Sequence, residues 1–371
     1  MNTLSCTKRF VARALAVAVS AALLCTSAAQ ACTSFLLVAK DGSKAYGRTM
    51  EFGVDMKAQV TMIPRGYAMS GSLPNGETGK RWTSRYATMG LNGFGLPIVI
   101  DGLNEKGLAG GMLFFPGYAK FASAKDAPKA KAIGSWEFLG LVLTSYASVA
   151  EVKQAIAAGE FVVVDTVQAD LGSTPPLHYT LHDTTGASIV VESVDGRLVV
   201  TDNPYGVFTN APEFGWHMTN LRNYTTVSPD FPKPVKVMGQ TLIPFSTGAG
   251  MRDLPGDQSS PSRFVEALAY VATLQTPANA MENVKSAEHI LNHFDIVNGS
   301  VGEYSAGVKG QGGYEITYWS AISDMTNLRF YFKTYDNQSL RYVDMKDFDL
   351  DAKAVRYVPT TQPSAPQRLT P

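Results

Sequence analysis

One cysteine in this sequence stands where its thiol and its own amine can act together. Ala29-Gln30-Ala31 has the small-x-small pattern of a signal-peptide cleavage site, and Cys32 follows it directly. Cleavage after Ala31 would make Cys32 the first residue of the mature chain, so that a thiol and a free α-amine lie on one residue. An α-amine has a pKa of about 8, so at pH 7 a useful fraction is neutral and accepts a proton. We therefore expect Cys32 to be a nucleophile that is activated by its own amine.

The first 31 residues have the parts of a secretory signal peptide. Lys8, Arg9 and Arg13 form a positive segment, and an uncharged apolar stretch follows over residues 14–24. This stretch is shorter than the roughly 20 residues that span a membrane. We therefore predict cleavage, export and no membrane insertion of the mature chain. An uncleaved anchor or a buried N-terminal helix stays open as an alternative.

Cleavage would also remove Cys6 and Cys25, so Cys32 would be the only cysteine left and no internal disulfide could form. A lone thiol in an oxidising compartment is a liability, which favours a functional role. A cysteine that is merely small and buried, and a cysteine that is lipidated, both stay open as alternatives. Lipidation normally requires leucine three positions before the cysteine, where this chain has Ala29.

The overall composition excludes several classes of protein. The 371 residues are 45% hydrophobic and 17% charged, which is too apolar for a disordered chain and long enough for a sizeable core. The mature chain would carry 29 Lys and Arg against 32 Asp and Glu, so nucleic acid is not an expected partner. His289 and His293 have zinc-like i, i+4 spacing, but residue 290 is Ile and the Glu of a zinc-binding helix is missing. We expect no metal and no cofactor.

A hairpin must position the groups around Cys32. Residues 33–38 have a strand pattern, Asp41-Gly42 is a turn signal, and a second strand ends near Arg48. The hairpin would return Arg48 to the cysteine, where a guanidinium stabilises a thiolate. Glu51 follows three residues later, and we expect it to accept a hydrogen bond from the α-amine. Without further context, either charge could instead form a structural ion pair.

These residues resemble the choloylglycine hydrolase family, which includes penicillin V acylases and bile salt hydrolases. The family begins with Cys-Thr and has Arg sixteen residues after the nucleophile, which is Arg48 here. Glu51 stands where the family usually has Asp, so the carboxylate is kept. Four further segments match in the family's order, and the resemblance covers about residues 32–344. They are DGLNEKGLAGGMLFFP (101–116), NPYGVFTNAPEF (203–214), LPGDQSSPSRF (254–264) and TYWSAISDMTNLRFYFKTYDN (317–337).

The resemblance implies an N-terminal-nucleophile hydrolase of the α+β class, an αββα four-layer sandwich with two stacked antiparallel sheets. Residues 32–355 would form this domain after the signal peptide of residues 1–31, and the proline-containing residues 356–371 are expected to be a disordered tail. Asn210 falls on the family's oxyanion-hole asparagine, and Arg263 on a late active-site arginine. Similarity to exported Gram-negative members implies a periplasmic enzyme, and a homotetramer is expected by family analogy.

Phe114 is the departure that bears on the substrate. Bile salt hydrolases commonly have Asn at this position, whereas Phe has no side-chain donor, so donation there must come from a backbone N–H. Penicillin V acylases often have an aromatic residue here. We therefore expect a small-molecule acyl amide of the penicillin V or N-acyl homoserine lactone type, hydrolysed through a thioester, with Phe114, Phe52 and Met50 lining an apolar pocket. A conjugated bile salt hydrolase and an inactive exported binding protein of the same fold stay open.

The rest of the chain alternates strand and helix patterns. The Pro/Gly-rich stretch 228–252 is expected either to project for subunit contact or to be a long surface loop. Strands are predicted over residues 177–183, 188–193, 197–202, 314–323, 328–334 and 339–344. Helices are predicted over residues 133–146, 149–158, 262–274 and 287–292, the second opening on a capping box at Ser148 and stopping at Gly159.

Overall fold

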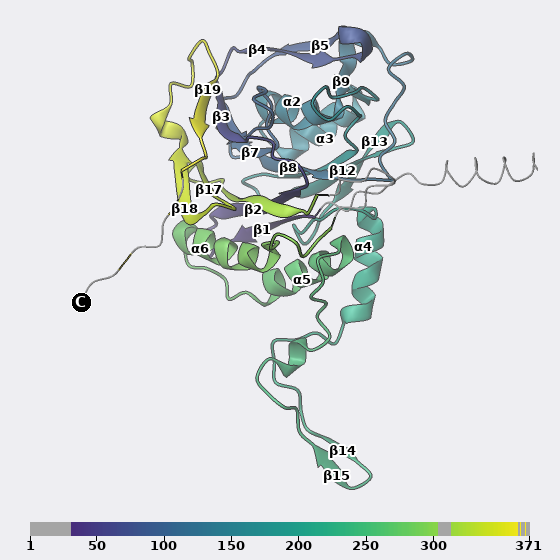
Figure 1. Cartoon of the computed structure of the whole chain (residues 1–371), viewed down its shortest axis with the longest axis vertical. Coiled ribbons are helices and arrows are strands. Elements are labelled where there is room, and N and C mark those ends of the chain that lie inside the picture. Colours follow the sequence, from purple (N-terminus) through teal and green to yellow (C-terminus); the bar gives the residue numbers. More distant parts are fainter. Residues whose placement is uncertain (1–30, 303–312, 363, 365–367, 369–371) are drawn as a thin grey trace, which may run out of the picture.

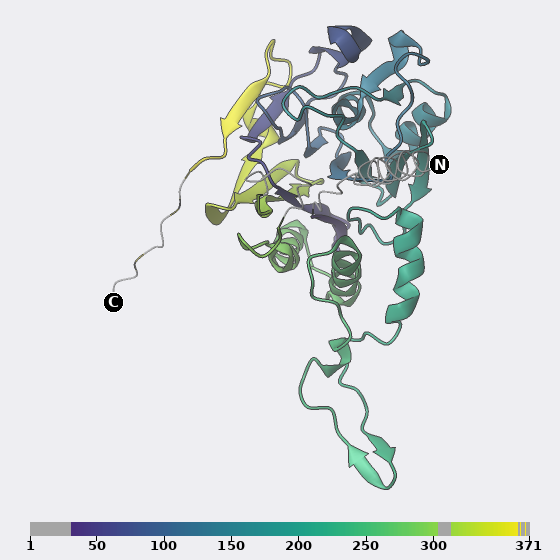
Figure 2. The same cartoon turned by 45° about the vertical axis from the view of Figure 1, so that its right-hand side comes forward.

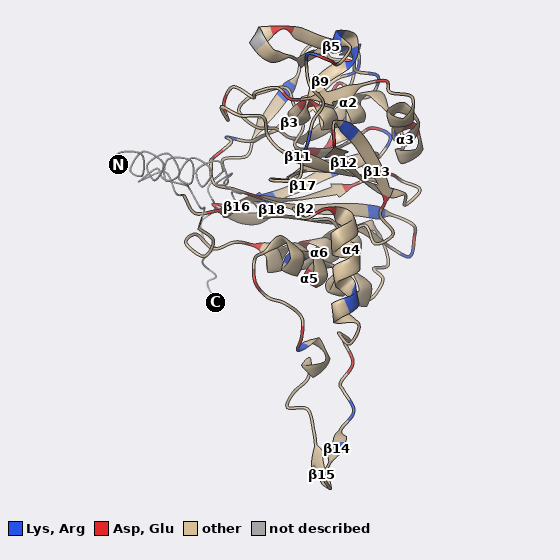
Figure 3. Ribbon diagram, turned by 90° about the vertical axis from the view of Figure 1, so that its right-hand side faces the viewer, with Lys and Arg blue, Asp and Glu red and all other residues tan. Residues whose placement is uncertain are grey.

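The computed structural model describes residues 31–302, 313–362, 364 and 368. Two antiparallel sheets are stacked face to face in it, and helices cover the outer face of each (Figures 1 and 3). This arrangement confirms the predicted αββα sandwich of the α+β class. The predicted signal peptide lies outside the described residues, apart from Ala31. No helix in the described part of the chain has the length and apolar character to cross a membrane.

The first sheet carries the predicted nucleophile and has five strands. In spatial order these are β1 (Cys32–Val38), β2 (Lys44–Phe52), β16 (Ile316–Asp324), β17 (Arg329–Thr334) and β18 (Asn337–Asp344). Its outer face is covered by α5 (Ser260–Thr273) and α6 (Ala280–Leu291), with α4 (Phe214–Asn220) packed beside α5 (Figure 1). The β1–β2 hairpin is the one expected from the sequence.

The second sheet has eight strands and packs against the inner face of the sheet that contains the β1–β2 hairpin. In spatial order they are β13 (Arg197–Asp202), β12 (Ser188–Val194), β11 (Leu177–His182), β8 (Ala109–Phe114), β7 (Asp101–Asn104), β6 (Thr88–Leu91), β3 (Gln59–Ile63) and β19 (Arg356–Pro359). The helices on the outer face of this sheet are α2 (Phe138–Ser145) and α3 (Val149–Ala157). The remaining strand pairs are β4 (Ala68–Ser72) with β5 (Thr78–Thr83), β9 (Ala132–Gly134) with β10 (Val162–Val164), and β14 (Val235–Val237) with β15 (Gln240–Leu242).

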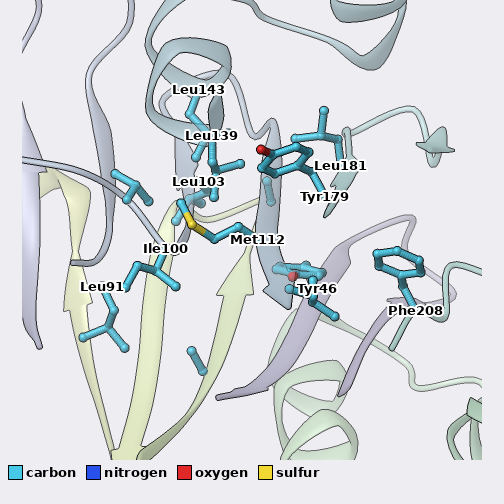
Figure 4. Packing of buried hydrophobic residues seen from close by; sticks show 14 of the residues in the cluster. Tyr46, Leu91, Ile100, Leu103, Met112, Leu139, Leu143, Tyr179, Leu181 and Phe208 are labelled. Carbon is cyan, nitrogen blue, oxygen red and sulfur yellow. The ribbon is translucent and has the colours of Figure 1, made fainter. Parts of the chain in front are cut away.

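The core lies between the sheets and under the helices, where buried side chains from both layers pack together (Figure 4). Gly111 of β8 shows how closely the sheets approach. A Cβ at this position would lie 2.4 Å from Tyr46 Oη and 3.3 Å from Arg48 Cδ, both on β2. A larger residue here would press on the Tyr46 hydroxyl and crowd the Arg48 side chain, so glycine allows the close approach of the two sheets.

Three element predictions need correction. Residues 356–359 were expected in a disordered tail, but they form β19, which pairs antiparallel with β3 and completes the edge of the large sheet. The helix predicted over 287–292 begins much earlier, because the Asn279 side chain accepts hydrogen bonds from Met281 N and Glu282 N and so caps α6 at its true start. Similarly, α2 begins at Phe138, and residues 132–134 form β9 instead of a first helical turn.

The stretch 228–252 projects far from the sandwich and ends in the β14–β15 hairpin (Figure 2). Its tip carries exposed apolar side chains, including Met238 and Phe245, which are 98% and 106% exposed. The sequence left open whether this segment projects or is a long surface loop, and in the structure it projects.

Candidate functional site

The register of the β1–β2 hairpin decides which groups face the predicted nucleophile. Cys32 is paired with Met50, and Ser34 with Arg48, so Arg48 and Met50 share the face of the sheet that carries the cysteine side chain. The Nη2 atom of Arg48 lies 3.5 Å from Cys32 Sγ. Cys32 itself is 2% exposed. The sequence therefore correctly predicted the juxtaposition of thiol and guanidinium.

Arg48 is fully buried and is held from several sides. Its Nη1 donates to Asp101 Oδ2 at 3.1 Å and to the carbonyl of Ile100, and its Nη2 donates to the carbonyl of Met112 at 2.7 Å and lies 2.9 Å from Met50 Sδ. Burial raises the pKa of Asp101, and the Arg48 charge opposes this rise. The guanidinium is thus a fixed cation beside the sulfur, and Asp101 is its counter-charge.

Asn210 connects the start of β1 to two other parts of the site. Its Oδ1 accepts hydrogen bonds from Cys32 N at 2.5 Å and from Arg263 Nη2 at 2.9 Å. Its Nδ2 donates to the carbonyl of Phe114 at 2.8 Å. A primary amide has two N–H donors, so one remains for another acceptor. Asn210 can therefore hold the cysteine nitrogen and still donate one hydrogen bond to a bound group.

Arg263 approaches the hairpin from the helical side. It lies in the first turns of α5, is 1% exposed, and donates from Nη1 to the carbonyl of Cys32 and to Thr33 Oγ1. Burial lowers the pKa of Arg263, while the nearby acidic groups and the Cys32 thiol oppose this shift. Arg263 therefore fixes the backbone of the cysteine and the acceptor atom of Asn210 together.

The predicted role of Glu51 is not supported by its position. Side chains alternate between the two faces of a strand, so Glu51 points away from the thiol face and toward the helices. Its Oε1 accepts a hydrogen bond from Thr317 Oγ1 at 3.0 Å, whereas the nitrogen of Cys32 is bound to Asn210. Burial raises the pKa of Glu51 to about 8, and the charge of Arg263 opposes the rise. Asn210, not Glu51, orients the cysteine nitrogen in this structure.

An apolar cavity opens onto the thiol. All three predicted pocket residues, Phe114, Phe52 and Met50, line it together with Cys32 and Arg48. The rings of Phe52 and Phe114 meet edge to face with centroids 6.3 Å apart. Among the described residues that line the wall, polar atoms come only from the side chains of Cys32, Arg48 and Gln168 and the indole N–H of Trp136, so the cavity suits an uncharged, apolar group.

A second, wider cleft adjoins this cavity under the β4–β5 hairpin. Ile98, Trp136 and Gln168 line both spaces and form the boundary between them. Within the part of the chain that the structure describes, the wider cleft has three carboxylates in its wall and no basic side chain. A group that extends beyond the apolar cavity therefore meets acidic side chains in the wall of this cleft.

Sequence reasoning missed several residues that support this site. Asp101 lay inside a matched segment, but nothing in its spacing from Arg48 indicates a partner 53 residues away on the other sheet. Trp319 donates from Nε1 to Asp101 Oδ2 at 2.8 Å and so fixes the counter-charge. The Nε2 atom of His217 lies 2.9 Å from the carbonyl oxygen of Asn210. The sequence did not indicate this contact, because a single histidine has no diagnostic spacing.

Comparison with known proteins gives consistent matches over nearly the whole chain. The model of the linear amide C–N hydrolases of the choloylglycine hydrolase family matches residues 32–357. A bile salt hydrolase/transferase from Clostridium perfringens is 31% identical over 331 residues, which covers 88% of this chain and 95% of the relative. A penicillin V acylase from Pectobacterium atrosepticum is 24% identical, covering 91% of this chain and 87% of the relative.

The solved structures give the same result. A variant of the conjugated bile acid hydrolase from Clostridium perfringens superimposes with a TM-score of 0.78 at 28% identity, covering 91% of this chain and 100% of that one. The similarity to these proteins thus extends from the predicted nucleophile, Cys32, to β19 and includes the hairpin and both sheets.

Proposed function

The chain belongs to the choloylglycine hydrolase family and is a hydrolase of linear amide C–N bonds, and from this premise we propose that Cys32 is the nucleophile and that the substrate is an N-acyl amide with an apolar acyl group. The observation that carries the proposal is the environment of Cys32. Arg48 lies 3.5 Å from its sulfur, and Asn210 binds its nitrogen, at the wall of an apolar cavity. A structural cysteine would need neither contact.

The proposed reaction begins with removal of residues 1–31, which turns the nitrogen of Cys32 into an amine. The amine takes the thiol proton, directly or through a water molecule, and the thiolate adjacent to Arg48 attacks the acyl carbon. The remaining N–H of Asn210 Nδ2, with a backbone N–H, donates to the oxyanion. One such donor typically lowers the barrier by about 2.7–4 kcal/mol. The protonated amine then gives its proton to the leaving amine, and water hydrolyses the thioester by the same route.

The cavity supports an apolar acyl group as the part of the substrate that is buried. The aromatic and methionine side chains of its wall would pack against a phenoxyacetyl or aliphatic acyl chain, as in penicillin V or N-acyl homoserine lactones. Phe114 has no side-chain donor, so in this chain the second oxyanion donor is a backbone group. Conjugated bile salts are the second candidate, because curated relatives of about 31% identity are bile salt hydrolases.

We further propose that the enzyme is exported to the periplasm and assembles as a homotetramer. The signal-peptide pattern supports export, and the exposed apolar tip of the β14–β15 hairpin supports a covered surface in an assembly. N-terminal mass spectrometry of the exported protein should find an unmodified Cys32 as its first residue. Light scattering should give four times the mass of the mature chain, and a monomer would contradict the assembly alone.

The direct test is turnover by the mature chain and by its Cys32→Ser variant. Penicillin V, an N-acyl homoserine lactone and glycocholate should be assayed side by side, and the wild type should release the amine from at least one of the first two. Cys32→Ser should fold and lose turnover, and a quenched wild-type reaction should contain an acyl adduct on the peptide that begins at Cys32. Turnover retained by Cys32→Ser would exclude the proposed nucleophile, and preference for glycocholate would favour the bile salt alternative.

A further inference from the structure

His217 of α4 contacts the backbone of Asn210 directly. Its Nε2 lies 2.9 Å from the carbonyl oxygen of Asn210, and the imidazole is fully buried. A carbonyl oxygen can only accept a hydrogen bond, so Nε2 carries the proton in this contact. His217 thus reaches the residue that binds the nitrogen of Cys32, without itself touching the cysteine.

The surroundings of His217 favour a neutral ring held in one orientation. The imidazole stacks on Phe264 of α5, with ring centroids 4.7 Å apart and planes inclined by 15°. Nδ1 makes no hydrogen bond within the described part of the chain. Burial lowers the pKa of His217 to about 4, and the nearby Arg263 acts in the same direction. The ring therefore stays uncharged at neutral pH, with its donor aimed at Asn210.

The contact also closes a short chain of interactions around the site. Phe264 is the neighbour of Arg263, whose Nη2 donates to the side chain of Asn210 at 2.9 Å. The segment between Asn210 and His217 is fixed a second time, because Glu192 Oε1 accepts a hydrogen bond from Phe214 N at 3.0 Å. Asn210 is thus held through its side chain by Arg263 and through its backbone by His217.

We propose that His217 is a positioning residue for the amide hydrolysis, which holds Asn210 through its backbone carbonyl so that the Asn210 side chain meets both the nitrogen of Cys32 and the oxyanion. This inference rests on the proposed function of Cys32 and Asn210. Displacement of a catalytic group by about 1 Å is enough to slow an enzyme about a hundredfold. Loss of the His217 donor therefore acts on the chemical step more than on substrate binding.

The test compares two substitutions that differ in one donor. His217→Gln places an amide nitrogen near the position of Nε2 and keeps the hydrogen bond, whereas His217→Phe keeps the stacking on Phe264 and removes the donor. We expect His217→Phe to lower kcat about tenfold to a hundredfold, with KM changed less than about threefold. His217→Gln should retain kcat within about threefold. Thr219→Ala on the exposed side of the same helix is the control and should leave kcat and KM unchanged, because its hydroxyl bonds only to the carbonyl of Gly215 within α4.

Two results would overturn the proposal. One is a folded His217→Phe protein with kcat within twofold of wild type, and the other is an equal loss in His217→Gln and His217→Phe. Where His217→Phe does not fold, His217→Asn replaces it, because its shorter amide ends near the position of Nδ1 and cannot reach the Asn210 carbonyl.

A crystal structure separates this proposal from the proposed function. In His217→Phe, or in His217→Asn if that variant is used, the Asn210 side chain should have moved away from the nitrogen of Cys32, and in His217→Gln it should not. This result depends on no substrate. An unmoved Asn210 would exclude the positioning role even if the wild type hydrolysed none of the tested amides, whereas that lack of turnover alone would count against the proposed function.

Discussion

Arg48 of β2 and Asp101 of β7 form an ion pair across the interior of the sandwich, with Nη1 3.1 Å from Oδ2 and both side chains at most 1% exposed. The pair joins the two sheets beside the cavity. The other guanidinium nitrogen of Arg48, Nη2, lies 3.5 Å from the sulfur of Cys32. A buried pair of this kind contributes little net stability compared with apolar residues, but removal of one partner leaves an uncompensated charge. The position of the pair is therefore better explained by the thiol than by stability.

Arg48→Met should destabilise the protein by about 3–5 kcal/mol because Asp101 loses its counter-charge. The double variant Arg48→Met/Asp101→Asn should recover a large part of this loss, since neither buried charge remains. The free energies of unfolding of the wild type, Arg48→Met, Asp101→Asn and the double variant, measured by urea denaturation, give the coupling between the two residues. Alkylation of Cys32 by iodoacetamide at pH 7 should be slow in both Arg48 variants. Recovery of fast alkylation in the double variant would show that Arg48 does not act on the thiol.

Asn210→Asp separates the two functions of the Asn210 side chain. The carboxylate keeps an acceptor for the nitrogen of Cys32 and for Arg263, but it has no N–H for the oxyanion or for the carbonyl of Phe114. We expect kcat to fall about 10²–10³-fold, as for other lost oxyanion donors, with Cys32 still open to alkylation. Asn210→Ala, which also loses the acceptor, serves as the comparison and should be at least as slow. An aspartate variant with nearly normal kcat would assign the oxyanion contact to other groups.

The buried carboxyl of Glu51 should make stability depend on pH. Burial raises the pKa of Glu51 from an ordinary value of 4.5 to about 8, so between these values the folded protein holds a proton that the unfolded chain has lost. The free energy of unfolding therefore falls as pH rises through this window, by at most about 1.4 kcal/mol per pH unit.

Glu51→Gln lacks this contribution and isolates it. The difference in unfolding free energy between wild type and Glu51→Gln should shift against the wild type from pH 5 to pH 8 and level off above pH 8. Parallel curves for the two proteins across this range would show that the carboxyl titrates normally. Thr317→Val is a useful companion, because it removes the hydroxyl that Glu51 Oε1 accepts from and leaves the carboxyl in place.

The sequence contained enough information to predict the hairpin and the residues around the thiol, because these depend on local patterns. A strand, a turn and a second strand of known length place Arg48 diagonally opposite Cys32, and the structure has this pairing. The same alternation, with a period of two, places Glu51 on the opposite face from Arg48. The side of the sheet on which Glu51 lies is therefore also contained in the local pattern.

Other features depend on packing between distant segments and could not be predicted locally. Asp101 reaches Arg48 from the other sheet, and β19 pairs with a strand almost 300 residues earlier in the chain. The proline-containing composition of the last residues suggested a tail, but the pairing of Arg356–Pro359 with β3 overrides local composition where an open sheet edge is available. The contact of His217 with Asn210 depends likewise on the turn between them and on Phe264 of another helix.

Retention of Ala31 should separate the roles of the sulfur and the nitrogen of Cys32. In the structure Ala31 is attached and buried, and the sulfur still lies 3.5 Å from Arg48 Nη2, while the nitrogen is a peptide N–H bound to Asn210. A peptide nitrogen cannot accept the thiol proton. A chain that begins at Ala31 should therefore react with iodoacetamide but hydrolyse amides at least about 10²-fold more slowly than a chain that begins at Cys32, since it has lost its general base. The chain that begins at Cys32 is made separately as the comparison, and equal turnover by the two chains would mean that the base is another group.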